Sequence, residues 1–299
     1  MDLVSTFEAQ RPHLTSLCYR MLGDRAGAED AVQETWLRWM GADHAAVENP
    51  AAWLRRAATN IAIDALRSAR QRRETYVGPW LPEPLLHSET GPEDAFVLAQ
   101  ECELALLWAM ERLGEEERAA FILREAFDAG YDELAASLGK SQAACRQLVS
   151  RAHKRLQESG PRFDAPDAEV QDLIARFFAA ATAEDGETAI KLFAPQAVAI
   201  SDGGRKARAA RRVLTGPEEI VQVMMAVWRK SAGDGDWSIE PCVANGAPGV
   251  IRRMDGEIDF VLTLAPDRES RIVWLYVMRN PDKLPTHLDL SLSTQKETR

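Results

Sequence analysis

Basic residues gather in two short segments of this 299-residue chain, although the formal net charge is −10. Segment 49–75 holds six arginines against one aspartate and one glutamate, and segment 137–158 holds five basic residues against Glu158 alone. Cationic side chains concentrated in this way bind phosphate groups, so each segment is either a phosphate-binding surface or a solvated helix face. The acidic remainder predicts weak DNA binding by the isolated chain, because non-specific affinity depends on neutralised phosphates.

A third pattern places acidic and apolar side chains together. Asp30, Gln33, Glu34 and Leu37 are spaced at i, i+3, i+4 and i+7, which puts all four on one face of a helix. An acidic face with an apolar centre suits a basic groove on a partner protein. The alternative is a solvated face whose leucine points into the core.

Other chemistries find little support in the residue types. The four cysteines form no CxxC pair, which argues against a zinc site or a disulfide framework, and we expect no metal and no cofactor. No apolar run approaches the ~20 residues that span a bilayer. The first residues lack the basic start and apolar stretch of a secretory signal. We therefore expect a cytoplasmic protein with no membrane contact.

Helices must position these residues in the first half of the chain. Apolar residues recur at helical spacing, and Gly23, Gly41 and Pro50 mark the breaks between the first three helices. A short helix, a turn at Gly139 and a longer basic helix form a helix-turn-helix pattern that Ser141 can cap, although an ordinary helical hairpin has the same outline. The expected helices are 14–22, 26–40, 50–73, 92–113, 115–127, 131–138 and 141–157.

The rest of the chain has a different character. Four prolines interrupt segment 76–92, yet its apolar residues around Trp80 and Leu81 suggest that this linker packs on something. Beyond residue 166, apolar residues from Val170 to Ala181 predict one helix. Alternating apolar residues then predict strands at 198–200, 237–241, 258–264 and 272–278, with a further helix at about 217–228. Helices followed by strands indicate a separate α+β domain. The last residues, 285–299, are polar and expected to fray.

Several of these segments resemble a known family. The run from Asp30 to Leu37 resembles the polymerase-binding helix of bacterial sigma factors, and 50–54 with 59–67 resembles the promoter −10 helix of the extracytoplasmic-function (ECF) group. The helix-turn-helix resembles the −35 reader of that group. Three further motifs, at 80–84, 202–206 and 280–284, resemble signatures of the subgroup that carries a C-terminal SnoaL-like extension.

The resemblance implies a multidomain protein with two all-α sigma domains followed by an α+β, cystatin-like curved-sheet domain. The implied divisions are 1–75 for sigma region 2, 76–92 for the linker, 93–160 for sigma region 4, 166–284 for the SnoaL-like domain and 285–299 for a flexible tail. It also implies that the chain binds RNA polymerase core enzyme and promoter DNA, and directs promoter-specific initiation.

Residue roles follow from the same resemblance, combined with residue chemistry. Cationic side chains would follow the DNA backbone, and an amide or guanidinium could read a base edge. The polymerase-binding residues are Asp30, Gln33, Glu34 and Leu37. The −10 residues are Arg56, Asn60, Arg67 and Arg70. The −35 residues are Ser141, Gln142, Arg146, Gln147, Arg151 and Lys154.

The extension is expected to regulate the sigma domains by an intramolecular contact with them or with the linker. The residues assigned to that contact are Trp80, Leu81, Pro82, Asp202, Gly203, Gly204, Lys206, Asn280, Pro281, Asp282, Lys283 and Leu284. Small isomerases share the SnoaL-like fold, so an enzymatic domain or an unidentified small-molecule ligand stays open. However, no histidine occurs between Ala165 and Pro285, so only carboxylates such as Asp202 offer acid–base chemistry. A stand-alone helix-turn-helix regulator is the other alternative.

Overall fold

The computed structural model describes residues 2–86, 99, 102–158, 165–231 and 236–285. The chain divides into two compact units. The helical unit comprises Met1–Thr75, Pro92–Cys102 and Leu106–Ser159, and the sheet unit comprises Tyr76–Gly91, Glu103–Ala105 and Gly160–Arg299. The expected tail beyond residue 285, and the expected helical start near Pro92, lie outside the described residues.

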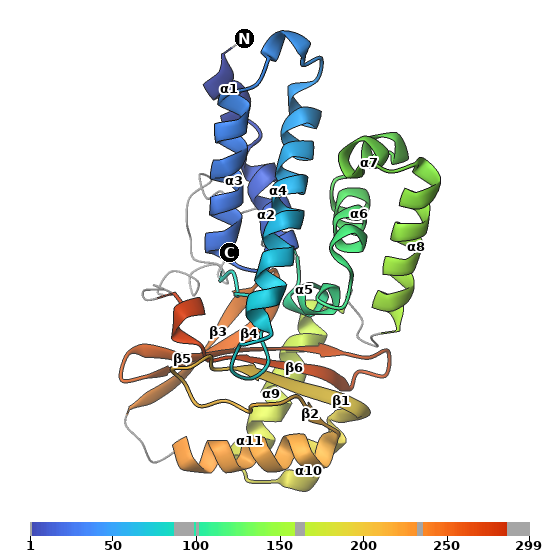
Figure 1. The fold of residues 1–299 in the computed structure, drawn as a ribbon. Coiled ribbons are helices and arrows are strands. Elements are labelled where there is room, and N and C mark those ends of the chain that lie inside the picture. The colour runs from blue at the N-terminus through green and yellow to red at the C-terminus, as the bar shows by residue number, and fades with distance from the viewer. Residues whose placement is uncertain (1, 87–98, 100–101, 159–164, 232–235, 286–299) are drawn as a thin grey trace, which may run out of the picture. The chain divides into compact units, whose positions relative to one another are not determined.

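The first half of the helical unit packs four α-helices around an apolar core (Figure 1). Gly23 ends the second helix in the left-handed region, at φ 76°, and Asp24 then caps the third by accepting a hydrogen bond from the Gly27 amide. Trp39 is fully buried, and its indole donates to the Leu3 carbonyl at 3.1 Å. These elements are α1 (Leu3–Glu8), α2 (Arg11–Leu22), α3 (Arg25–Met40), the short 3-10 helix η1 (His44–Ala46) and α4 (Pro50–Arg73).

The second half contains α5 (Leu104–Met110, of which the first two residues belong to the sheet unit), α6 (Glu115–Ala126), α7 (Tyr131–Leu138) and α8 (Gln142–Gln157). Gly139 ends α7 at φ 64°, a conformation that costs glycine little, and Ser141 caps α8 by accepting from the Ala144 amide. The pair α7–α8 forms the predicted helix-turn-helix, and α8 buries one apolar side that includes Cys145 and Leu148.

Helix α4 contacts α6 and α7 as well as α2 and α3. Ile63 is consequently only 6% exposed, although its spacing groups it with the polar residues Arg56 and Asn60. The helix is covered on two sides because it is the element that both halves of the unit share.

The sheet unit is built on six strands in the order β2-β1-β6-β5-β4-β3. Strands β1 and β6 pair in parallel, and every other neighbouring pair is antiparallel. The strands are β1 (Phe193–Asp202), β2 (Leu214–Thr215), β3 (Trp237–Ala244), β4 (Ala247–Met254), β5 (Glu257–Pro266) and β6 (Ile272–Met278).

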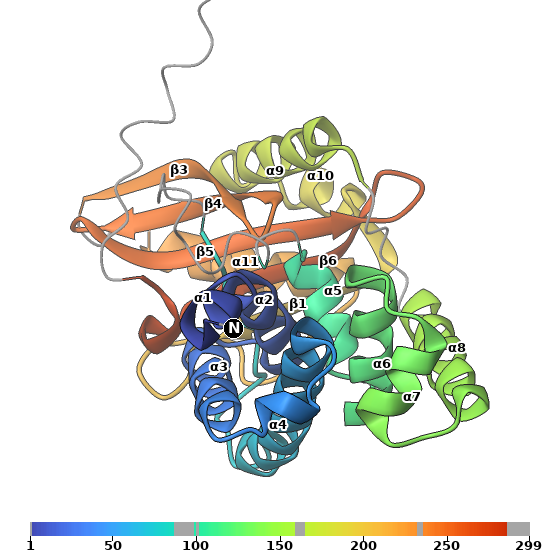
Figure 2. The same cartoon turned by 90° about the horizontal axis from the view of Figure 1, so that it is seen from above.

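One face of this sheet is covered by α9 (Asp167–Thr182), α10 (Gly186–Lys191) and α11 (Pro217–Ser231) (Figures 1 and 2). Leu262 and Leu275 point into that core. The opposite face, at Thr263 and Tyr276, lies against Leu81 of segment 76–86. All residues of β6 are therefore buried, because both faces of the central strands are covered.

Segment 76–86 adds no named helix or strand to the unit, apart from an isolated antiparallel bridge between Leu86 and Ala244. Its apolar side chains are buried, with Leu81 2% and Leu85 1% exposed. Segment 76–86, which we call the linker strip, was expected to pack on another surface, and it packs on the sheet of its own unit. Across the described part of the chain, no helix has the length and apolar character needed to cross a membrane.

Candidate functional site

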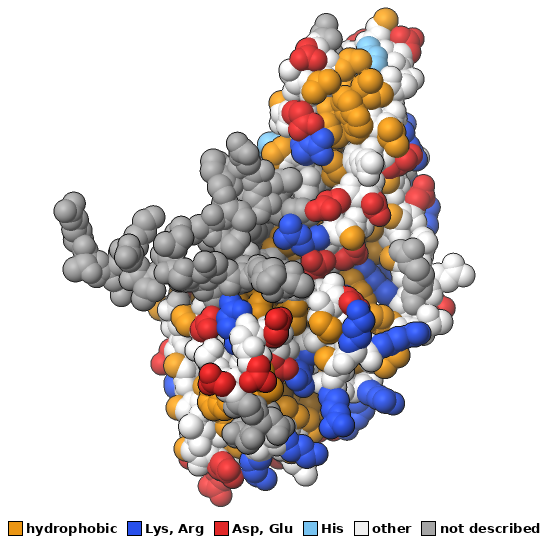
Figure 3. Space-filling view, turned by 90° about the vertical axis from the view of Figure 1, so that its left-hand side faces the viewer, with side chains coloured by type: hydrophobic (Ala, Val, Ile, Leu, Met, Phe, Trp, Pro, Cys, Tyr) orange, Lys and Arg blue, Asp and Glu red, His pale blue; other side chains and the backbone are white. Residues whose placement is uncertain are grey.

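The predicted acidic and apolar face lies on the solvent side of α3. Asp30, Gln33 and Glu34 are exposed, and Leu37 is 59% exposed. The alternative that placed this leucine in the core is therefore wrong. Met40, one turn further along α3, is 49% exposed, and Figure 3 shows hydrophobic side chains gathered at this end of the helical unit. The face offers an apolar centre flanked by carboxylates, of which Glu34 forms an ion pair with Arg38 at 3.1 Å.

The cationic residues of α4 divide into two groups. Arg56 is exposed and Asn60 is half-buried beside it, one turn further along the helix. Arg67 forms an ion pair with Asp64 at 3.2 Å, so this aspartate orients an arginine on the same helix. Arg56 and Asn60 are thus accessible to a ligand in this conformation.

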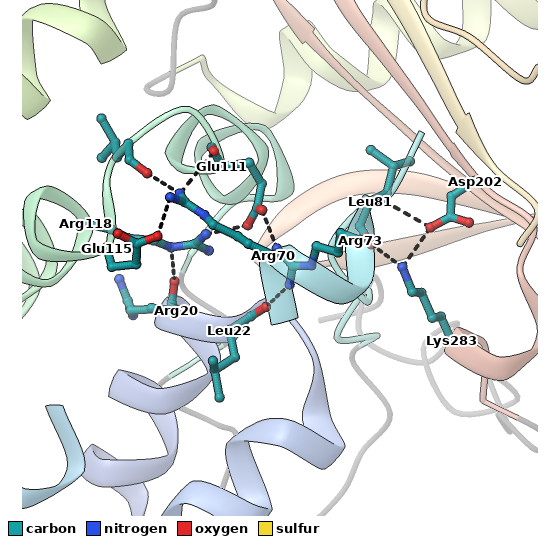
Figure 4. A network of polar contacts seen from close by, with 11 residues as sticks. Arg20, Leu22, Arg70, Arg73, Leu81, Glu111, Glu115, Arg118, Asp202 and Lys283 are labelled. Atoms are coloured by element: carbon teal, nitrogen blue, oxygen red, sulfur yellow. Dashed lines mark hydrogen bonds and ion pairs between the residues drawn. The ribbon is translucent and has the colours of Figure 1, made fainter. Parts of the chain in front are cut away.

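Arg70 is engaged by the second half of the helical unit (Figure 4). Its guanidinium contacts the Glu115 carboxylate at 2.6 Å and also donates to the Leu113 carbonyl. Arg73, close to the end of α4, pairs with Glu111 and donates to the Leu22 carbonyl at 2.7 Å. The structure therefore brings Arg70, which the sequence assigned to DNA, into a protein contact.

Glu111 lies between two arginines. One carboxylate oxygen contacts Arg73 and the other contacts Arg118, whose side chain is fully buried and also donates to the Arg20 carbonyl at 3.0 Å. Burial alone would raise the pKa of Glu111, but the charges of Arg118 and Arg73 hold that pKa below its usual value. Burial lowers the pKa of Arg73, yet a guanidinium stays protonated at neutral pH. The cluster therefore remains ionised.

The start of α8 presents the residues expected to read duplex DNA. Ser141, Gln142, Arg146 and Gln147 are all exposed. The Arg146 guanidinium lies over the Tyr131 ring, 4.9 Å from its centre, which restrains a long side chain at the point where it would meet a base.

The expected phosphate contacts of α8 are partly occupied. Glu117, which is 8% exposed by side chain, pairs with Arg151 at 3.0 Å and with Arg155 at 2.5 Å. Both arginines nevertheless stay about half exposed, and Lys154 is exposed beside them. A buried glutamate thus fixes two guanidinium groups on the surface, which leaves their remaining N–H groups able to reach an anion.

In the sheet unit, Asp202 is the centre of a second polar network (Figure 4). The residue is fully buried at the end of β1, and its carboxylate accepts from the Leu81 amide at 3.0 Å and the Lys283 ammonium at 2.7 Å. It also accepts from the Tyr76 hydroxyl at 2.6 Å and the Gly204 amide at 3.0 Å. Lys283 in turn donates to the Leu81 carbonyl at 2.6 Å. We call Tyr76, Leu81, Asp202 and Lys283 the aspartate clamp.

The predicted motifs at 80–84, 202–206 and 280–284 therefore meet at this clamp. The Lys283 ammonium lies 4.2 Å from the centre of the Trp80 ring, while Lys206 pairs with Asp282 across two of the motifs. Gly204 has φ 56°, and a Cβ there would lie 2.8 Å from the Asn280 side chain, so the close approach requires glycine. Around them, Pro82 and Leu284 are buried, Gly203 makes the turn after β1, and Pro281 begins the 3-10 helix η3 (Pro281–Lys283).

Sequence reasoning missed two residues that hold the same strip. The Tyr76 hydroxyl donates to Asp202 and accepts from the Asn280 amide at 2.9 Å. The pKa of Tyr76 is raised, mainly because the hydroxyl is buried and also because it donates a hydrogen bond to Asp202. Asn245 is fully buried in the β3–β4 turn and accepts from the Leu85 amide at 2.8 Å. Neither residue stands in a motif, so only the tertiary contacts identify them.

The sheet unit also contains a cavity of about 580 Å³, formed by α9, α11, β3 and β4. Aromatic and aliphatic side chains dominate its lining, including Phe178, Trp228 and Trp237, and the described lining contains no carboxylate and no histidine. Asp202 is committed to the clamp, and Asp259 is paired with Arg279. The described lining is therefore largely apolar, and Cys242 is the residue in it that carries an ionisable side chain.

Comparisons with known proteins identify the family of this chain. The Sigma-70 region 2 family model matches residues 6–73, and the Sigma-70 region 4 model matches residues 103–156. The chain is 35% identical over 289 residues to the ECF RNA polymerase sigma factor SigJ of Mycobacterium tuberculosis, covering 94% of this chain and 92% of SigJ. It is 27% identical to the probable ECF sigma factor SigI of the same species, covering 94% of each chain.

A solved structure extends the likeness to three dimensions. The crystal structure of Mycobacterium tuberculosis SigJ superposes with a TM-score of 0.73 at 32% identity, covering 95% of this chain and all of that one. The chain belongs to the ECF sigma factors of the sigma-70 family, which bind RNA polymerase and direct promoter-specific initiation. Its sheet unit is the SnoaL-like C-terminal domain of the subgroup that the three motifs predicted.

Proposed function

We propose that this sigma factor docks on core RNA polymerase through the exposed face of α3. The observation that carries the proposal is the 59% exposure of Leu37, because a helix facing only water rarely presents a large apolar side chain among carboxylates. A basic groove with an apolar floor would bury Leu37 and pair with Asp30 and Glu34. Such a partner places the protein in the cytoplasm.

We infer that promoter recognition divides between α4 and α8. Arg56 and Asn60 are accessible on α4, and they would hold a strand of the −10 element by a backbone phosphate and a base edge. The exposed side chains at the start of α8, led by Arg146, would enter the major groove of the −35 element. Arg151 and Lys154 would contact phosphates beside it.

We infer that the SnoaL-like domain regulates initiation by holding the linker, rather than by catalysis. The aspartate clamp joins segment 76–86 to the end of β1 and to η3, which follows the neighbouring strand β6, through a buried ion pair. A linker held in this way limits the separations that the sigma domains joined by it can adopt. The apolar cavity would take a small hydrophobic ligand, if the domain senses one.

The direct test is run-off transcription with purified core RNA polymerase, with and without the chain. Because a buried apolar anchor contributes about 2 kcal/mol or more to an interface, Leu37→Asp should weaken binding to the core by ~30-fold or more and reduce transcription accordingly. The matched control is Val243→Asp, since Val243 is an exposed apolar residue (42%) on β3 of the sheet unit.

Charge reversal provides the second arm of this test. Glu34→Lys should also weaken association with the core, because it replaces a carboxylate on the docking face by an ammonium. If Leu37→Asp and Glu34→Lys both bind the core as tightly as the unmodified chain, α3 is not the docking helix.

A further inference from the structure

The loop that joins β1 to β2 is the most basic short segment of the sheet unit. Between residues 205 and 212 it contains five cationic residues, and the other three are alanines. We call residues 205–212 the basic loop. It stands out because the chain as a whole carries a net charge of −10. Figure 3 shows Lys and Arg side chains gathered on one side of this unit.

The charges of the basic loop are only partly neutralised within the protein. Lys206 pairs with Asp282, and Arg212 pairs with Glu219. Arg205, Arg208 and Arg211 are exposed, and the structure gives their side chains no ion pair within the described ranges. Three guanidinium groups are therefore available to an external anion.

The backbone of the basic loop is held in place. Arg279 donates to the Arg208 carbonyl at 2.8 Å, and the Ala207 amide donates to the Gly203 carbonyl at 3.0 Å. A Cβ at Gly203 would lie 2.4 Å from the Ala207 carbonyl oxygen, so the turn closes too tightly for any side chain there. The aspartate clamp fixes the start of the loop, and pairing of β2 with β1 fixes its end. The arginines thus project from a pre-ordered segment.

The loop also borders a hollow of about 600 Å³. Apart from Val77, the side chains that line this hollow are small or cationic, and Arg205, Arg208 and Arg211 stand among them. A protein partner would usually require aromatic or large aliphatic anchors, and a membrane surface would require an apolar face. A surface of arginine and alanine instead matches a partner that is recognised by negative charge.

We propose that the basic loop is an additional DNA-contacting surface, which binds the phosphate backbone of promoter DNA in the initiation complex. This proposal goes beyond the promoter contacts proposed for α4 and α8, because it assigns DNA binding to the regulatory domain itself. The contact is sequence-independent, since the loop offers guanidinium groups for phosphates and no amide side chain for a base edge.

The test uses holoenzyme, formed from core polymerase and the full chain, on a promoter duplex that the unmodified holoenzyme selects from a random-sequence library. The triple variant Arg205→Ala, Arg208→Ala and Arg211→Ala removes three charges from the loop. The matched control removes three exposed charges elsewhere in the same unit, by Lys191→Ala, Lys230→Ala and Arg268→Ala. Thermal unfolding verifies that both variants are folded.

Promoter affinity is measured by fluorescence anisotropy between 50 and 200 mM salt. If three phosphate contacts are lost, the negative slope of log affinity against log salt should become less steep by ~2.7, so the loss of affinity between 50 and 200 mM salt should be ~40-fold smaller. The control should keep the slope of the unmodified holoenzyme. An unchanged slope in the loop variant, or an equal fall in the control, would overturn the proposal.

A photo-crosslinking arm identifies the partner directly. The holoenzyme carries p-benzoylphenylalanine in place of Arg208 and is irradiated on the selected promoter. The expected product joins the chain to DNA. A crosslink only to a polymerase subunit would make the loop a protein-docking surface and reject DNA binding. Failure of the unmodified holoenzyme to select any promoter would instead count against the sigma function, which separates the two conclusions.

Discussion

Replacing Asp202 by asparagine is expected to release the linker strip from the sheet unit. The two carboxylate oxygens have different partners: Oδ1 accepts from Tyr76 and Gly204, and Oδ2 accepts from the Leu81 amide and the Lys283 ammonium. Asparagine keeps the size and one acceptor oxygen. With Oδ1 retained, its amide NH₂ would face two donors, so both hydrogen bonds on the Oδ2 side would be lost.

The magnitude follows from those two bonds. Both bonds are accepted by the charged carboxylate, and a hydrogen bond to a charged group contributes ~1.5–3 kcal/mol. Their sum is close to the ~3–5 kcal/mol that the loss of one member of a buried ion pair costs. At about 3 kcal/mol, local opening of the strip becomes ~150-fold more frequent.

Hydrogen–deuterium exchange of segment 76–86 measures this opening, because the Leu81 and Leu85 amides are bonded only while the strip is docked. Asp267→Asn is the matched control, since Asp267 accepts from Arg271 within the β5–β6 turn of the same unit. Exchange of 76–86 at the unmodified rate in Asp202→Asn, or acceleration to the same extent in Asp267→Asn, would refute the reasoning.

Four further outcomes are expected. Arg146→Ala should cost ~1–3 kcal/mol at one promoter position, measured by binding to single-base variants, whereas an equal loss on every sequence would make Arg146 a phosphate contact. Gly139→Ala should lower the free energy of unfolding by ~1 kcal/mol in denaturant titrations, because alanine is strained at φ 64°. The pKa of Glu111 is lowered, so its contribution to stability is present above pH ~4.5 and lost as pH falls through the lowered pKa; thermal unfolding of Glu111→Gln should therefore show a flatter acid profile. Truncation after Arg279 removes Lys283 and should change promoter-dependent run-off transcription, and unchanged output would remove the regulatory role of the clamp.

Much of the helical unit could be predicted from the helical spacing of apolar residues and from the glycine and proline residues that begin or end helices. Pro50 starts α4 and Gly139 separates α7 from α8, as expected, because both residues act through local backbone constraints. Helix α1 was missed because its six residues are too short to show a repeat. Strand β4 was missed because its central residues are buried on both faces, and this removes the alternation that identifies a half-exposed strand.

The sequence could predict which site residues share one helix face, because that depends only on local spacing. It could not predict contacts between distant segments. Spacing along one helix grouped Leu37 with Asp30 and Glu34, but the exposure of Leu37 came only from the structure. Arg70 and Glu115 form an ion pair although they are 45 positions apart, and no pattern within α4 predicts this contact. The clamp shows the same limit, because its motifs could be recognised separately but the bond between Asp202 and Lys283 is a product of the sheet topology.

The capture of Arg70 by Glu115 has a consequence for how ionic strength acts on promoter opening. A free arginine that binds DNA releases the counter-ions of a phosphate, so its contribution weakens steeply as salt is added. Arg70 must first leave a carboxylate, and salt weakens that bond as well. A −10 role for Arg70 would require its transfer from Glu115 to a phosphate, and this exchange of anions would have a nearly salt-neutral balance. Arg56 pairs with no carboxylate among the described residues, so its contact with DNA would determine how strongly DNA binding by α4 depends on salt.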